Sequence, residues 1–379
     1  MAQAYTPGLK VTGRTMLRKL RTLPLKGDVL VKLGDMVKAD DIVAKTDLPG
    51  SVQTINVMNL IGCEAREVPE MMLKKEGEQI TEGEVIAESK PLFAFLKFMA
   101  AKVKSPIDGT IEKISSVTGQ VLLREPPQPV TISAYIDGKV AKVIPNEGVV
   151  VETTCTFIQG IFGIGGETNG ELIVIVKGPG DEIKPDDITE KLKGKVVVCG
   201  KYVDIDVFNK ARSVGVKGLI TGGFGDKDLK QILGYDLGVA ITGHEHIGIS
   251  LVVTEGFGKI DIADKTFNLL KANEGMQTSL SGATQIRAGV IRPEIIIPLK
   301  DGIAVGTEKA ADESGGGVKE GDPVRIIREP NFGHLAKVKR LIPELMVVES
   351  ETKVRVMEVE FDNGESFIVP RANVEIIEE

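Results

Sequence analysis

The chain has 379 residues, enough for about two to four domains with ample core. Its composition is that of an ordinary soluble globular protein, and its net charge of −7 argues against binding nucleic acid or a membrane surface over the whole molecule. No apolar run approaches the roughly 20 residues that span a bilayer, and the first residues lack the apolar core of a signal peptide. We therefore expect a cytoplasmic protein without a membrane span.

The three cysteines, Cys63, Cys155 and Cys199, are far apart and form no Cys-x-x-Cys pair. This spacing argues against a disulfide scaffold and against an iron–sulfur cluster.

Residues 1–26 are rich in basic side chains. The basic residues are Lys10, Arg14, Arg18, Lys19, Arg21 and Lys26. Such a run is more often the solvated face of a strand than a binding arm, although an arm for an acidic partner is the alternative.

A repeat organises the N-terminal region. Residues 34–46 and 77–89 match at their glycines, acids and aliphatic positions, except that Asp40 stands against Gly83. A second element, beginning with glycine and alternating apolar residues, occurs at 50–55, 109–114 and 138–143. This pattern predicts short half-buried strands, and the repetition predicts two pseudo-symmetric halves that bury their faces against each other.

The repeat, together with Ser105-Pro106-Ile107-Asp108-Gly109-Thr110-Ile111, resembles the biotinyl/lipoyl type of barrel-sandwich hybrid. The version in the C subunit of Rnf-type complexes and the A subunit of Na⁺-translocating quinone reductases is the most similar. The resemblance covers roughly residues 25–125 and implies this fold for a region that we place at 1–150.

Carrier members of this family present a modified lysine in a tight hairpin, as Met-Lys-Met or Asp-Lys-Ala. Neither tripeptide occurs here, and Lys90 is too close to Gly83 to take that place. We therefore expect no biotin and no lipoate. The cysteine clusters of the Rnf subunit are also missing, so the resemblance does not imply electron transfer.

An apolar segment at 91–101 separates the repeat halves and holds three of the twelve phenylalanines. It is interpreted as a core helix or strand; the alternative is an exposed patch for a partner or for self-association.

Residues 151–193 are interpreted as a β connector and linker. The glycine-rich stretch at 160–170 is unlike a phosphate-binding loop, because a strand pattern at 172–176 follows it where a helix is needed. We expect a glycine-rich turn or bulge.

Residues 194–300 show the pattern of an α/β domain. Apolar strands at 195–199, 216–221 and 238–242 alternate with helical patterns, as in right-handed crossovers. Asp204, Asp226 and Asp261 are the predicted helix caps, and Gly215, Gly234 and Gly275 the predicted stops. Only six residues separate Thr242 from the apolar run at 249–254, too few for a crossover helix, which favours antiparallel pairing or the start of a helix; if the run is parallel, its loop joins the carboxyl edge.

The loops that follow Cys199, Thr221 and Thr242 are expected together at the carboxyl edge of the sheet, the usual ligand site of open α/β folds. The candidate ligand-binding residues there and nearby are Thr221, Gly222, Gly223, Thr242, Gly243, His244, Glu245, Thr254, Glu255 and Arg287. The alternative is that tight turns alone require these glycines.

His244 and His246 are weak candidates for metal ligands, which Glu245, Glu255 or Asp264 would complete. A solvated turn is the favoured interpretation, and we predict no metal. No nucleophile–base arrangement is visible, so no catalytic residue is assigned.

Residues 301–318 contain Ser314-Gly315-Gly316-Gly317 and are predicted to be a flexible linker. Beyond it, Gly321-Asp322-Pro323-Val324-Arg325-Ile326-Ile327, Phe332-Gly333 and Ala336-Lys337-Val338 resemble a KOW motif of the NusG-like, SH3-like barrel, over residues 319–379. An Asn363-Gly364 turn fits the closing hairpin.

The KOW resemblance implies binding to RNA, the ribosome or the transcription machinery. Residues 319–379 carry 9 basic and 13 acidic residues, however, which favours docking of a protein. The basic residues that make a local cluster are Arg325, Arg328, Lys337, Lys339 and Arg340.

The expected architecture is multidomain α/β plus β. The leading hypothesis is a non-catalytic binding or scaffold protein that docks a protein partner or another copy of itself through its terminal β modules. One alternative is an enzyme or small-ligand sensor at the carboxyl edge of the α/β domain. The other is an RNA-, ribosome- or transcription-associated factor that acts through residues 319–379.

Overall fold

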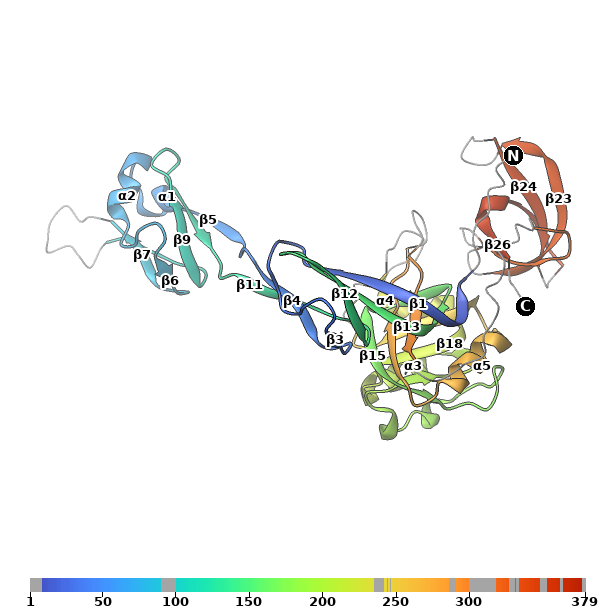
Figure 1. Ribbon diagram of the computed structural model, residues 1–379. Helices are drawn as coiled ribbons and strands as arrows, with labels where there is room; N and C mark the ends of the chain where they lie inside the picture. Colours follow the sequence, from blue (N-terminus) through green and yellow to red (C-terminus); the bar gives the residue numbers. More distant parts are fainter. Residues whose placement is uncertain are drawn as a thin grey trace.

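The computed structural model describes residues 9–89, 100–234, 242–243, 245, 247–285, 291–299, 318–326, 331, 334–347, 353–361 and 364–376. It is an α/β plus β protein, as expected, with several sheets and short helices. A central body carries an elongated arm on one side and a curved five-stranded C-terminal unit on the other (Figure 1). None of the described helices is long and apolar enough to cross a membrane.

The body is built on a twelve-stranded mixed sheet. Its parallel section comprises, in spatial order, β15 (Glu167–Val174), β16 (Val196–Val198), β18 (Gly218–Phe224) and β19 (Ser250–Phe257). Strand β14 (Phe162–Ile164) pairs antiparallel with β19, and β17 (Tyr202–Val203) pairs with the end of β18. Strands β16 and β18 are buried along their whole length, as expected for a sheet covered on both faces.

Helix α3 (Ile205–Val214) confirms both of its predicted ends. The Asp204 carboxylate accepts the Val207 N–H at 2.8 Å, and Gly215 is left-handed at φ 85°. Helix α4 (Asp226–Leu233) ends at Gly234 as predicted, but Gly225 occupies its N-cap position instead of Asp226.

Helix α5 (Asp264–Ala272) corrects the third prediction. It begins three residues after Asp261, and its N-cap is Ala263, whose N–H donates to the Glu255 carboxylate at 3.1 Å. The Glu255 side chain on β19 therefore supports the start of this helix. No local sequence rule predicts this contact, because Glu255 belongs to another element. Two 3₁₀ turns, Pro185–Asp187 and Glu190–Leu192, connect β15 to β16.

The run at 249–254 forms β19, which pairs antiparallel with β14 on one edge and parallel with β18 on the other, so the expectation of antiparallel pairing holds for one edge only. The expectation rested on a preceding strand at 238–242. Thr242 lies outside any strand, residues 238–241 lie outside the described residues, and α4 supplies the crossover from β18 to β19.

An antiparallel section extends the sheet from β15 through β20 (Gln277–Ser281) and β21 (Glu294–Pro298) to β13 (Gly148–Gln159). The first half of β13 pairs with β12 (Gly138–Ile144) and the second half with β21. Strand β1 (Val11–Thr22) pairs with the other edge of β13 along its length.

These pairings correct the predicted domain boundaries at 150 and 193. Strand β13 crosses the first boundary, and β15, assigned to the connector, lies in the middle of the sheet. The glycine-rich stretch at 160–170 contains β14 and the start of β15, with no helix after it, in agreement with a turn.

The N-terminal repeat forms two separate units. The proximal unit contains β2 (Asp28–Val29), β3 (Met36–Val37), β4 (Ile42–Leu48), β11 (Gln128–Ser133), β12 and the start of β13. The distal unit contains β5 (Val52–Asn56), α1 (Val57–Ile61), the 3₁₀ turn Ala65–Glu67, α2 (Val68–Met71), β6 (Gln79–Ile80), β7 (Val85–Glu88), β8 (Lys102–Lys104), β9 (Gly109–Ile114) and β10 (Gln120–Arg124).

The two units repeat each other's hydrogen bonds. Gly34 N–H donates to the Val140 carbonyl at 2.9 Å, and Gly77 N–H donates to the Ile111 carbonyl at 2.7 Å. The copy at 34–46 therefore pairs with the element at 138–143, and the copy at 77–89 pairs with the element at 109–114. Each copy has its own hydrophobic core. The prediction that the two copies bury their faces against each other is wrong.

A two-stranded ribbon joins the two units. The β4–β11 pairing ends at Leu48↔Gln128, the β5–β10 pairing begins at Val52↔Arg124, and the Glu125 N–H donates to the Ser51 carbonyl between them. The β4–β11 and β5–β10 pairings share one register, so the distal unit is inserted into the β4–β11 hairpin. It stands at the end of the arm (Figure 1).

The C-terminal unit is one sheet in the order β25 (Ser366–Pro370), β24 (Lys353–Glu360), β23 (Leu335–Val347), β22 (Pro323–Ile326), β26 (Val374–Ile376). A 3₁₀ turn, Arg371–Asn373, precedes β26. Gly364 in the predicted turn is left-handed, at φ 83°. The interpretations of residues 91–99 and of the linker at 301–317 fall outside the described residues.

Candidate functional site

The carboxyl ends of β18 and β19 carry five of the predicted ligand residues, Thr221, Gly222, Gly223, Thr254 and Glu255. Thr221 Oγ1 lies 3.1 Å from the carbonyl oxygens of both Gly200 and Gly223. Thr254 Oγ1 donates to the Thr221 carbonyl at 3.3 Å. Both hydroxyls are buried and are engaged by backbone groups.

The glycines at this edge accommodate the chain itself. A Cβ on Gly222 would collide with the Ile260 carbonyl oxygen, and one on Gly223 would collide with the Gly258 carbonyl oxygen. The segment after β19 therefore folds directly over both positions, where the sequence suggested that a ligand would approach the backbone.

Thr242, Gly243 and Glu245 lie elsewhere. Thr242 Oγ1 donates to the Gly163 carbonyl at 2.8 Å, beside β14. One Glu245 carboxylate oxygen accepts the N–H groups of Gly243 and Gly165, next to the start of β19. The predicted ligand residues thus fall into two groups at opposite ends of β19. His244, His246 and Arg287 lie outside the described residues.

Glu255 belongs to a buried ionic cluster between the body and the C-terminal unit. Arg325 on β22 is only 3% exposed, and its guanidinium donates to Glu255 at 2.8 Å. A second guanidinium nitrogen of Arg325 lies 3.7 Å from Glu375 on β26.

Glu375 is 2% exposed and connects three segments. It accepts Arg292 at 2.9 Å and the backbone N–H of Leu9 at 2.7 Å. The cluster, which we call the C-terminal junction, comprises Glu255, Arg292, Arg325 and Glu375. Its two cations and two anions balance, as buried charges require.

The placement of Arg325 changes its predicted role. Arg325 was expected in a basic surface cluster and Glu255 at a ligand site, yet the two side chains pair with each other inside the molecule. The two residues are 70 positions apart in the sequence and lie on different sheets, so no local signal would have paired them.

The other basic candidates remain on the surface. Lys337, Lys339 and Arg340 are exposed on β23. Lys339 lies 3.2 Å from Glu360 and 3.6 Å from Glu358, and Arg340 lies 3.5 Å from Glu358. The Glu360 hydrogen bond raises the pKa of Lys339. Acidic neighbours on β24 thus offset this cluster; Arg328 lies outside the described residues.

A second ionic cluster, the arm junction, fixes the proximal unit to the body. Lys19 on β1 lies 2.6 Å from Glu294 on β21, and Arg21 makes two bonds of 2.7 Å to Glu167 on β15. The Tyr135 hydroxyl donates to Glu294 at 3.1 Å, and burial raises the pKa of Tyr135 well above its usual value. Two of the basic residues at 1–26 thus pair with acids of the body.

A surface cluster at the carboxyl edge was not anticipated from the sequence. Glu182 lies 2.8 Å from Lys259 and 3.3 Å from Lys201, and the Lys259 ammonium stands over the Tyr202 ring. The Lys259 hydrogen bond lowers the pKa of Glu182. The predicted loop after Cys199 was the only signal that led towards Lys201 and Tyr202.

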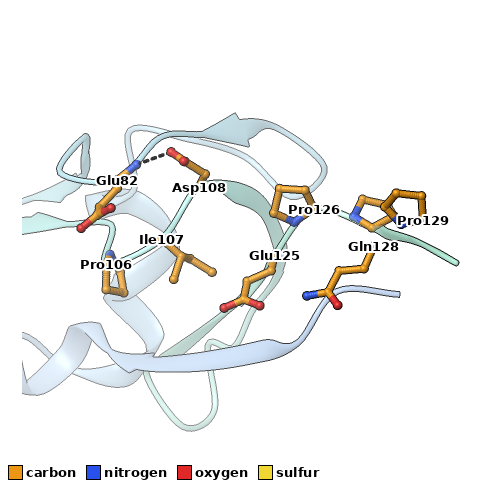
Figure 2. A pocket seen from close by; sticks show the side chains of 9 residues that line it. Glu82, Pro106, Ile107, Asp108, Glu125, Pro126, Gln128 and Pro129 are labelled. Carbon is orange, nitrogen blue, oxygen red and sulfur yellow. Dashed lines mark hydrogen bonds between the residues drawn. The ribbon is translucent and has the colours of Figure 1, made fainter. Parts of the chain in front are cut away.

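A hollow in the arm lies where the ribbon meets the distal unit (Figure 2). Its lining includes Pro106, Ile107, Glu125 and Pro126. The Asp108 carboxylate at its rim accepts the Glu82 N–H at 2.8 Å. The hollow is open to solvent and is lined by prolines and carboxylates. It does not enclose a ligand site.

Metal ligands and reactive thiols do not gather in the described part of the chain. Its residues include no group of three or more histidines, cysteines, aspartates or glutamates that would hold a metal ion. Burial raises the pKa of the Cys155 thiol to about 12 and also raises that of Cys199. The sequence matches no protein-family model and no curated protein.

Proposed function

We propose that the chain is a non-catalytic scaffold that docks macromolecular partners through its arm and its C-terminal unit, with the α/β body between them. The C-terminal junction is the observation that carries this proposal. Buried, matched charges from Glu255 and Arg325 hold the C-terminal unit to the body in one orientation. A fixed orientation is what a scaffold with two docking modules needs.

The finer fold assignments belong to the same proposal. We interpret the proximal and distal units as barrel-sandwich hybrids without an attached biotin or lipoate, and the C-terminal unit as an SH3-like KOW barrel. The matched hydrogen bonds of Gly34 and Gly77 support two units of one kind. A cytoplasmic location is part of this proposal.

A protein is the preferred partner of the C-terminal unit. Glu358 and Glu360 lie beside the exposed lysine and arginine side chains of β23, which weakens the field that attracts a phosphate backbone.

Cross-linking mass spectrometry of the full chain in its own cells tests the proposal. We expect intermolecular cross-links from lysines of the distal unit, such as Lys113, and of the C-terminal unit, such as Lys337. Lysines of the body should form mainly links within the chain. Intermolecular links confined to the body would contradict the proposal, and cross-links of Lys337 to RNA would replace the protein partner with RNA.

A second candidate function is a small-ligand sensor or enzyme at the surface cluster of Glu182, Lys201, Tyr202 and Lys259. Its position at the carboxyl edge of parallel strands favours it, because ligands of open α/β sheets bind there. Native mass spectrometry of the gently purified chain distinguishes the two. A small added mass that disappears in Lys259→Ala, but persists in Lys339→Ala, would favour the sensor.

A further inference from the structure

Strand β1 presents a long open edge at the base of the arm. It has 12 residues and pairs with β13 from Val11↔Ile158 to Thr22↔Gly148. Among the described strands, none pairs with its opposite edge. Because the backbone groups of a strand alternate in direction, about half of the N–H and C=O groups of β1 point away from β13.

The side chains on the outer face of β1 alternate between cations and apolar groups. Arg14, Met16, Arg18 and Leu20 occupy every second position and are exposed, Met16 at 65% and Leu20 at 59%. The row across the sheet is mixed: Arg18 lies opposite Glu152 and forms an ion pair with it at 3.1 Å, and Lys139 lies between Glu152 and the exposed Met36. Exposed apolar residues that gather on one sheet face mark an interaction surface.

We propose that this edge docks an extended acidic and apolar segment of a partner protein, which adds to the sheet as a strand beside β1. The inference rests on the proposed scaffold function, to which it adds a surface and a partner chemistry. Backbone hydrogen bonds supply affinity in this mode, and alternate side chains supply specificity. Acidic residues would lie beside Arg14 and Arg18, and apolar residues beside Met16 and Leu20.

Charge and composition select this partner over two others. Strand β1 carries four cations and no acid, so a second copy paired along it would add four more cations to the ladder and no acid to offset them, which is destabilising. It also has no aromatic residue on which the bases of a single-stranded nucleic acid would stack.

A short labelled peptide tests the inference on the full chain. The probe is Glu-Thr-Val-Thr-Glu-Thr-Val-Thr, whose acidic and apolar side chains share one face of an extended strand. The matched control peptide has lysine in place of glutamate. We expect the acidic peptide to bind in fluorescence anisotropy and to slow hydrogen exchange of the amides at 11–22.

Exposed substitutions separate docking from folding. The double variant Met16→Ser/Leu20→Ser, which removes the apolar groups without adding charge, should weaken binding of the acidic peptide about tenfold or more. The matched variant Leu60→Ser/Val117→Ser, which changes two exposed residues of the distal unit, should bind as the parent does. Circular dichroism checks that both variants remain folded.

Four results would overturn the inference. They are equal binding of the lysine peptide, no protection of β1 up to about 1 mM acidic peptide, competition by a uridine oligonucleotide, and a dimer that Met16→Lys dissociates. If the peptide fails while cross-links still arise from the distal and C-terminal units, the scaffold function stands without this surface.

Discussion

Ion pairs hold both the arm and the C-terminal unit to the body, but those at the C-terminal junction are buried and those at the arm junction are partly exposed. The arm shares its main chain with the body, because β13 pairs with β12 in the proximal unit and with β21 in the body. No described strand of the C-terminal unit pairs with a strand of the body. The three hydrogen bonds described above that join it to the rest of the chain all involve Arg325 or Glu375.

This difference determines what a single substitution can do. Ion pairs at the arm junction add to a continuous β ladder, so their loss should change stability more than orientation. Among the described residues, ion pairs and one backbone hydrogen bond of the C-terminal junction are the polar contacts that join the unit to the body, so their loss should release the unit.

The largest effect is expected at the C-terminal junction. Arg325→Met leaves Glu255 buried without its cation, which should cost about 3–5 kcal/mol of the coupling between body and C-terminal unit. Small-angle scattering should show a more extended molecule, and hydrogen exchange should increase in β22 and β26. Lys339→Ala, which removes surface pairs only, is the matched control and should leave both measurements unchanged. A compact Arg325→Met variant would show that other contacts hold the unit.

A substitution inside the body should destabilise it strongly but should release neither the arm nor the C-terminal unit. Gly223→Ala sets a methyl group against the Gly258 carbonyl and should destabilise the body by about 1–3 kcal/mol in chemical denaturation. Gly178→Ala, at a glycine that also lacks a positive φ but has open space around it, is the matched control and should leave stability nearly unchanged. A fully stable Gly223→Ala variant would mean that the segment after β19 does not pack as described.

At the arm junction, Lys19→Met should leave the arm in place. Glu294 then loses its cation and keeps the Tyr135 hydroxyl, and we expect a loss of about 1–2 kcal/mol in global stability, because the pair is only partly buried. The scattering profile should match that of the parent. A change in shape as large as that of Arg325→Met would erase the distinction between the two junctions.

The smallest effect is a dependence on pH at the arm junction. The folded-state pKa of Tyr135 is raised, because burial disfavours the phenolate. Its contribution to stability is therefore complete below pH 10 and is lost as the pH rises from 10 towards the folded-state pKa. Tyr135→Phe should lose about 1 kcal/mol at neutral pH and flatten the alkaline slope of the unfolding free energy. A slope equal to that of the parent would assign the alkaline loss to other groups, such as Cys155.

Local rules predicted the parts of the fold that depend on neighbouring residues. Asp204 and Gly215 mark α3 because a cap and a stop act within one turn. The duplicated hydrogen bonds at Gly34 and Gly77 likewise follow from a short repeated sequence.

Features that depend on distant pairing were missed. A single twelve-residue strand, β13, serves two regions, so no composition shift marks a boundary within it. The carboxyl-edge glycines were interpreted as room for a ligand, while the chain's own residues at 258–262 fill that room. Arg325 looked like a surface cation because its partner, Glu255, belongs to another sheet.

The unbroken register of the ribbon makes the distal unit a removable cassette. Leu48 and Gln128 are partners in the β4–β11 ladder. Residues 49–127 therefore leave the proximal hairpin and return to it at one pair of neighbouring residues. A two-residue turn is long enough to close two antiparallel strands at such a point. Excising the cassette there should yield a shorter chain with an intact proximal unit, and the same position should accept an unrelated domain whose termini lie close together.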